Sequence, residues 1–134
     1  MGYLLDTNTI VFFFRGHPQV IQRWQATPPD ALYLCSVVLY ELLVGVETST
    51  RPERRRQDVE DLRRYLRELD HTAREAAEAA RLAGYLRPRG TMIGLLDIQI
   101  AATALVHGLT VVTNNTREFT RIPGLRVEDW TTLP

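Results

Sequence analysis

The feature that most constrains the fold is the alternation of short apolar runs with longer segments of helical periodicity. Apolar runs at residues 3–5, 32–35 and 109–113 have the length and composition of buried strands. Between them, apolar residues recur three and four positions apart, which predicts helices at residues 17–26, 37–47, 51–69, 72–87 and 96–107. Short strands alternating with helices predict an α/β fold, with a central parallel sheet of about four to five strands and helices on both faces.

Weaker signals complete this outline. A short strand is expected at residues 69–70 and a last edge strand at 125–128, after a stretch of loop with a short helical turn. Ser36 and Thr72 are expected to cap the helices that follow them, and Gly108 to end a helix in a left-handed conformation. A chain of 134 residues can bury about two thirds of its unfolded surface, so a single domain, 1–134, is expected.

Composition excludes several classes of protein. The only cysteine, Cys35, cannot form an internal disulfide, which favours a reducing compartment such as the cytoplasm. No apolar run approaches the ~20 residues that span a bilayer, so no membrane partner is expected. The 16 acidic and 16 basic residues balance to a formal net charge of zero, so any binding of a nucleic acid must rely on a local group of positive charges. All the basic residues are Arg, which excludes a P-loop lysine or a Schiff base.

Some carboxylates lack a cationic neighbour. Of the 16 acidic residues, four have no Arg within four positions: Asp6, Asp30, Glu41 and Asp97. Asp30 lies in a Pro-Pro-Asp turn, where a solvated carboxylate needs no partner. The other three lie in apolar stretches, where an unpaired charge is costly and a bound cation would offset it. Because no His or Cys cluster accompanies them, the pattern favours a hard cation, Mg²⁺ or Mn²⁺.

Each of these acids also has a purely structural interpretation. Asp6 could cap a helix after the first strand, and Asp97 could stabilise the start of its helix through the helix dipole. Glu41 could reach water through a gap. The metal interpretation is favoured because the three occur together, and because ligand sites of parallel sheets lie at the carboxyl ends of the strands.

Four motifs follow one another along the chain: LLDTNTI (4–10), ELLVGVE (41–47), LLDIQIAATAL (95–105) and VVTNNTREFTRIPGLRVEDW (111–130). Together they resemble the PIN-domain ribonucleases, and more closely the VapC-type toxins of bacterial and archaeal toxin–antitoxin pairs. The resemblance covers essentially the whole chain. It implies a parallel sheet between helices, and an endoribonuclease that needs Mg²⁺ or Mn²⁺ and hydrolyses phosphodiester bonds of tRNA or rRNA.

The resemblance also implies roles for individual residues. The acids of the family fall on Asp6, Glu41 and Asp97, as metal ligands and catalytic residues. A fourth position stays open between the neutral Asn115 and Glu118, and Glu118 could instead pair with a neighbouring Arg on a surface turn. Other polar side chains are expected to orient the metal ligands rather than to bind the metal, namely those of Thr7, Asn8, Thr113 and Asn115.

Two arginines are expected to contact RNA phosphates, namely Arg15 near the first motif and Arg89 before the third. Seven Arg also lie between residues 51 and 67, but the acids among them favour a solvated helix face. The resemblance further implies a homodimer and a cognate VapB-type antitoxin that covers the acidic groove.

Rival families are less compatible with the sequence. Receiver domains and haloacid-dehalogenase-type phosphatases also place an Asp after the first strand, but both use a Lys, and the phosphatase motif needs Asp at the position of Asn8. The alternative that stays open is a non-catalytic PIN-like domain that binds RNA or protein through a weakened metal site, because Asn115 carries no charge.

Overall fold

The computed structural model describes residues 1–133; Pro134, which the expected domain 1–134 includes, lies outside the described residues. Five strands form one sheet, in the order β3-β2-β1-β4-β5, and every neighbouring pair is parallel. The strands are β1 (Tyr3–Leu5), β2 (Leu32–Cys35), β3 (Arg67–Leu69), β4 (Thr110–Val112) and β5 (Val127–Glu128). The predicted α/β class and parallel sheet are therefore confirmed.

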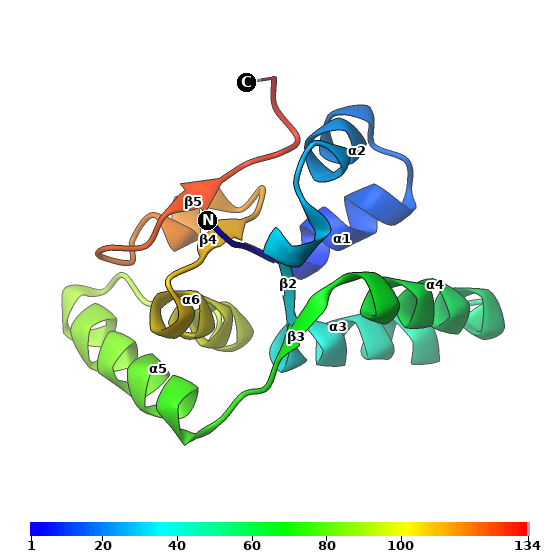
Figure 1. Ribbon diagram of the computed structural model, residues 1–134. Coiled ribbons are helices and arrows are strands. Elements are labelled where there is room, and N and C mark those ends of the chain that lie inside the picture. The colour runs from blue at the N-terminus through cyan, green and yellow to red at the C-terminus, as the bar shows by residue number, and fades with distance from the viewer. Residues whose placement is uncertain (134) are drawn as a thin grey trace.

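Helices cover both faces of this sheet. They are α1 (Thr7–Phe14), α2 (Pro18–Gln25), α3 (Ser36–Glu47), α4 (Pro52–Tyr65), α5 (Ala73–Leu86), α6 (Leu95–His107) and the short α7 (Thr116–Phe119), with 3-10 turns at Pro29–Ala31 and Arg87–Arg89. The chain moves from β1 outward to β3, then crosses back past β1 to β4. Since crossovers between parallel strands are right-handed, α1 to α4 lie on one face and α5 and α6 on the other, as Figure 1 shows.

The reversal of the chain's direction between β1 and β4 creates the point where such sheets bind ligands. Leu5 of β1 is in register with Val112 of β4, and the amide of Asp6 donates a hydrogen bond of 3.1 Å to the Val112 carbonyl. Asp6 and Thr113, the residues that follow these two strands, are thereby held next to each other at the carboxyl edge of the sheet.

Helix α1 is an element that the sequence analysis did not assign. It begins directly after Asp6, whose Oδ1 accepts a hydrogen bond of 2.8 Å from the amide of Thr9. Ile10 is fully buried, and the Phe13 ring stacks on Trp24 of α2 with 3.9 Å between ring centroids. The apolar side of α1 therefore anchors the helix that starts at the first predicted acid, and the capping role considered for Asp6 is confirmed.

Two local predictions were wrong. The helix expected over residues 51–69 ends at Tyr65, because residues 67–69 pair with β2 as strand β3. Ser36 does not cap α3 but is its first residue; its hydroxyl donates to the Leu69 carbonyl and accepts from the amide of His71. Ser36 therefore links the start of α3, directly after β2, to the end of β3 and the loop that follows it. The expected cap at Thr72 and the left-handed Gly108 (φ 66°) are confirmed.

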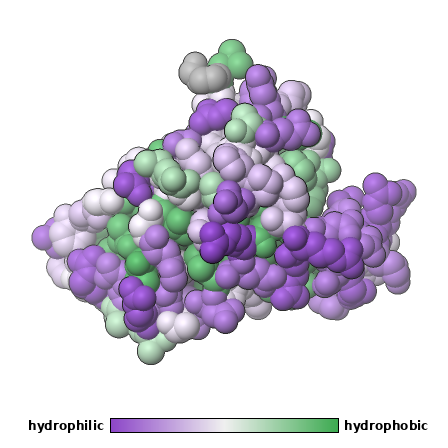
Figure 2. Space-filling view, in the orientation of Figure 1, coloured by the Kyte–Doolittle hydropathy of each residue, from purple (hydrophilic) through white to green (hydrophobic). Residues whose placement is uncertain are grey.

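The arginines of α4 lie on a hydrophilic surface, which Figure 2 shows at the side of the molecule where α4 projects in Figure 1. Several of them pair with nearby acids: Arg55 with Asp58, Arg56 with Glu47, Arg63 with Glu68 and Arg64 with Asp61. This pairing agrees with the predicted solvated helix face. Among residues 1–133, no helix combines the length and apolarity needed to cross a membrane.

A buried polar network joins the start of α5 to the end of α6. Glu75 is only 2% exposed and accepts hydrogen bonds from the backbone amide (2.8 Å) and the hydroxyl of Thr72. Its other oxygen lies 3.1 Å from Nε2 of His107. The bond from the Thr72 hydroxyl is the main reason that the pKa of Glu75 falls from its usual 4.5 to about 2.

We predict that Glu75→Ala lowers the free energy of unfolding at pH 7 by about 1–3 kcal/mol, because it removes a buried carboxylate that bonds to Thr72 and His107. The pKa of Glu75 is lower in the folded protein than in the unfolded chain. Its stabilisation is therefore present above pH 4.5 and is lost as the pH falls toward 2. Urea unfolding of the wild-type protein and of Glu75→Ala from pH 7 down to pH 2 should measure this. The difference between their free energies of unfolding should narrow below pH 4.5.

Glu78→Ala is the matched control, since Glu78 lies on the same helix and pairs with the exposed Arg81. It should cost no more than about 1 kcal/mol. An equal loss in the two variants would contradict the role given to the network.

Candidate functional site

A polar cavity of about 230 Å³ opens at the carboxyl edge of the sheet, at the switch point between β1 and β4. Its walls come from the start of α1, from α3, from the first turns of α6 and from the loop after β4. The lining residues are Asp6, Thr7, Asn8, Glu41, Asp97, Ile100 and Asn115. Three of the four acids that lack a nearby Arg in the sequence therefore meet in one place.

Asp6 is the most buried of these acids, with 5% of its surface exposed. Burial raises the pKa of its carboxyl group, while hydrogen bonds from Thr113 and Thr9 oppose that shift. The Thr9 hydroxyl also donates to the Val112 carbonyl (2.9 Å), which joins α1 to β4. Asp6 therefore caps α1 and lines the cavity at the same time, so the structural and functional interpretations of this residue are compatible.

Glu41 reaches the cavity from the side of α3. Its Oε1 accepts a hydrogen bond of 2.8 Å from the hydroxyl of Thr7, the first residue of α1. This bond fixes the carboxylate of Glu41 next to that of Asp6, although the two residues are 35 positions apart in the sequence.

Asp97 lies in the first turn of α6, where it is half-buried among other acids. Burial is the largest cause that raises its pKa from 3.8 to about 7; a hydrogen bond with Glu118 and the charges of Glu118, Glu41 and Asp6 add to it. Four carboxyl groups therefore interact at this edge, and their repulsion adds to burial in holding the pKa of Asp97 above its usual value.

Both candidates for the fourth position take part in this arrangement. The side-chain amide of Asn115 donates a hydrogen bond of 2.8 Å to Oε2 of Glu118. Within residues 1–133 no ion pair joins Glu118 to Arg117 or Arg121, so the surface-pair interpretation of Glu118 does not describe this structure. Asn115 therefore bonds to Glu118, which lies beside Asp97, so both candidates are present at this edge.

Other polar residues support the edge of the cavity. The hydroxyl of Thr113 accepts a hydrogen bond of 2.9 Å from the backbone amide of Asn115. The side-chain amide of Asn8 donates to Oδ1 of Asn114 at 3.2 Å. Sequence reasoning missed Thr9 and Asn114. The position of Thr9, three residues after a capping Asp, and that of Asn114, directly after β4, were the signals available.

The two predicted RNA-binding arginines lie in different places. Arg15 lines a second cavity that shares Thr7 and Glu41 with the acidic one. Arg89 does not line the acidic cavity: its guanidinium lies over the ring of Tyr85, 3.7 Å from the centroid, and donates to the Tyr85 carbonyl. The structure therefore brings Arg15, but not Arg89, next to the acids.

The donor atoms of the acidic cavity suit a hard divalent cation. They are carboxylate, amide and hydroxyl oxygens, and no Arg lines the cavity to neutralise them. Across residues 1–133, no three acidic, His or Cys side chains are already close enough to coordinate one ion together. The oxygen donors of the cavity nevertheless fit such an ion chemically.

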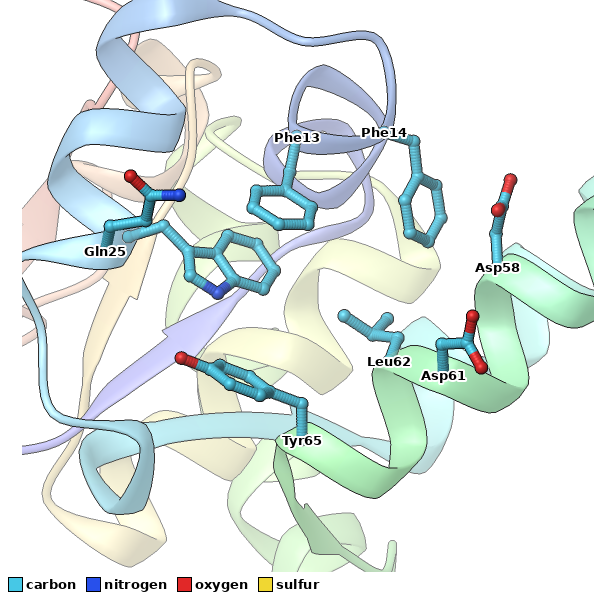
Figure 3. Close-up of a pocket in the computed structure, with 8 residues that line it drawn as sticks. Phe13, Phe14, Gln25, Asp58, Asp61, Leu62 and Tyr65 are labelled. Carbon is cyan, nitrogen blue, oxygen red and sulfur yellow. The ribbon is translucent and has the colours of Figure 1, made fainter.

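A larger cavity, of about 420 Å³, lies between α1 and α4 and has a different character. Phe13 and Phe14 point into it from α1, and Leu62 and Tyr65 from α4, as Figure 3 shows. Its carboxylates, on Asp58 and Asp61, already accept hydrogen bonds from residues of α4 itself. It lacks the unpaired acids of the smaller cavity, which remains the better candidate for chemistry.

We predict that Asp97→Asn stabilises the metal-free protein. The pKa of Asp97 in the folded protein, about 7, lies above its usual 3.8, so the folded state loses stability as the pH rises from about 4 to 7. The variant avoids that loss, and its Tm in chelator at pH 8 should rise by at least about 3 °C. Scanning calorimetry at pH 4 and pH 8 measures the difference.

Asp61→Asn provides the control, because Asp61 is exposed and accepts hydrogen bonds from Gln57 and Arg64. It should not raise the Tm. A gain for Asp97→Asn that is as large at pH 4 as at pH 8 would show that charge repulsion is not its cause.

Comparison with known proteins places this chain in a family. The family model of the PIN domain matches residues 3–125. A relative from Salmonella typhimurium, named tRNA(fMet)-specific endonuclease VapC, is 39% identical over 97% of this chain and 98% of its own length. A relative of the same name from Shigella flexneri is 36% identical over the same shares. The crystal structure of DNA-bound VapBC from Salmonella typhimurium contains a chain that aligns with a TM-score of 0.90 and 38% identity, over 97% of this chain and 98% of that one.

Proposed function

This chain belongs to the PIN-domain family, and from that premise we propose that it is a metal-dependent endoribonuclease of the VapC type, which hydrolyses phosphodiester bonds of RNA. The observation that carries the proposal is the meeting of Asp6, Glu41 and Asp97 in one oxygen-lined cavity at the switch point of the sheet. Relatives similar over almost their whole length bear the name of a tRNA-cleaving endonuclease, which supports the same reaction class.

PIN-domain nucleases in general depend on a divalent metal, and here we propose Mg²⁺, with Mn²⁺ as a substitute. Asp6, Glu41 and Asp97 are the proposed ligands, with Glu118 as the fourth acid of the site. When bound, the cation would lower the pKa of a water molecule and offset the charge of the scissile phosphate.

The chain's own residues hold the site in shape for this reaction. Thr9 and Thr113 fix the carboxylate of Asp6 at the end of β1, and Thr7 fixes that of Glu41. Asn115 holds Glu118 beside Asp97, and Asn8 bridges to Asn114 across the mouth of the cavity. Side chains positioned in this way need little reorganisation as charge develops on the substrate.

We predict that the purified protein cuts tRNA, and we propose initiator tRNA as the first substrate to test, because the relatives from Salmonella and Shigella are named for it. Cleavage of end-labelled tRNA and ribosomal RNA should require Mg²⁺ or Mn²⁺ and stop with chelator. Asp97→Asn should reduce the rate by about 100-fold or more, since it removes a charge from the centre of the site.

Asp61→Asn removes a carboxylate on the surface of α4 and should leave the rate unchanged. Cleavage that persists in chelator, or in folded Asp97→Asn, would contradict the metal assignment. A folded protein that binds Mg²⁺ but cuts neither RNA would favour the alternative, a non-catalytic PIN-like binding domain.

The proposed partners follow from the same relatives. The structural neighbour from Salmonella typhimurium is a VapBC assembly, and we propose that a VapB-type antitoxin holds this chain inactive. We also propose a homodimer, because Tyr40, Leu43 and Val44 expose large apolar side chains on one face of α3. A cytoplasmic location stays a prediction from the sequence.

A further inference from the structure

A cationic cavity of about 390 Å³ adjoins the acidic one. The two share Thr7 and Glu41, so they adjoin each other at these side chains. Beyond these shared residues, the second cavity is lined by Val11, Phe14 and Arg15 from the end of α1, by Leu42 and Gly45 from α3, and by Arg55 and Val59 from α4.

Both guanidinium groups of this cavity keep hydrogen-bonding capacity. Arg15 is exposed, and among residues 1–133 its side chain has no ion pair or hydrogen bond. One nitrogen of Arg55 donates to Asp58 at 2.9 Å, which leaves its other donors available. Two cationic side chains, from the end of α1 and from α4, therefore lie beside the acids. Of the two, only Arg55 has a carboxylate partner, Asp58.

We infer that this cavity binds the RNA nucleotide next to the scissile phosphate. Arg15 and Arg55 would contact phosphate oxygens, and the apolar wall formed by Val11 and Phe14 would contact the base. The inference rests on the proposed function, since it extends the substrate path away from the acids. Arg15 and Arg55 are positioning residues, and they add cationic contacts on RNA that the net charge of zero does not supply.

The size and shape of the cavity agree with this occupant. Cavities that hold small ligands span roughly 300–1,000 Å³, so the observed volume has room for about one nucleotide. Gly45 contributes to its wall without a side chain, and a Cβ added at this glycine would meet no atom within 4 Å. Phe14 also lines the larger aromatic cavity of Figure 3, so the two cavities adjoin at this side chain.

RNA binding by the double variant Arg15→Gln/Arg55→Gln tests the inference. Fluorescence anisotropy with a labelled initiator tRNA, in Mg²⁺ and in an Asp97→Asn background, measures affinity without cleavage. The Kd should rise about 10-fold or more, and loss of two phosphate contacts should reduce the slope of log Kd against log salt by about 1.4. In the otherwise wild-type enzyme, the same pair of substitutions should raise KM with little change in kcat.

Arg54→Gln is the matched control, because Arg54 is exposed on the same helix and lines neither cavity. A second variant, Gly45→Leu, fills the cavity without changing any charge. It suits a helix better than glycine does, so the protein should fold, and it should raise the Kd without altering the salt slope.

These outcomes separate the inference from the function on which it rests. Absence of cleavage by the wild-type protein would overturn the proposed function, while the binding experiment would still decide the role of the cavity. An unchanged Kd and salt slope in both the double variant and Gly45→Leu would overturn the inference. So would a double variant that keeps its RNA affinity and loses only its inhibition by a VapB-type antitoxin.

Discussion

The parallel pairing of β1 with β4 is the constraint on which the site depends. A single backbone hydrogen bond, from the amide of Asp6 to the Val112 carbonyl, brings the ends of these strands together. The hydroxyls of Thr9 and Thr113 then reinforce that contact, one by bonding to Val112 and the other by bonding to Asp6. Since the chain changes direction at this pair of strands, the helices on either side diverge and leave room for the acidic cavity.

This geometry brings carboxylates of like charge close together, which costs folding stability. The pKa of Asp97 is raised to about 7 by burial and by its acidic neighbours, so its ionisation opposes folding at neutral pH. Elsewhere the acids stabilise the fold: Glu75, which is more deeply buried, has a pKa of about 2 because hydrogen bonds surround it. The contrast between these two carboxyl groups distinguishes the proposed cation site from a structural hydrogen-bond network.

The sequence predicts much of this arrangement because its signals are local. Apolar runs predicted β1, β2 and β4, and helical periodicity predicted the long helices. The lack of a nearby Arg, within an apolar stretch, selected Asp6, Glu41 and Asp97. Helix α1 was missed because its polar first turn and aromatic end show no clear amphipathic period. A strand was expected near β3, at residues 69–70, but its start at Arg67 was masked by the helical pattern before it. The place of Arg55 in the cavity that Arg15 also lines depends on how α4 packs against α3, which no local pattern reports.

The order of the strands has a consequence for synthesis on the ribosome. The acids come from four separated stretches, and the last of them, Glu118, lies close to the end of the chain. Strand β4, which completes the centre of the sheet beside β1, is also a late segment. A nascent chain that has emerged only as far as α6 already carries Asp6, Glu41 and Asp97, but not the strand that brings them into register. Such a chain should therefore be inert toward the RNAs of the ribosome that is making it, until β4 and the segment that carries Glu118 have emerged.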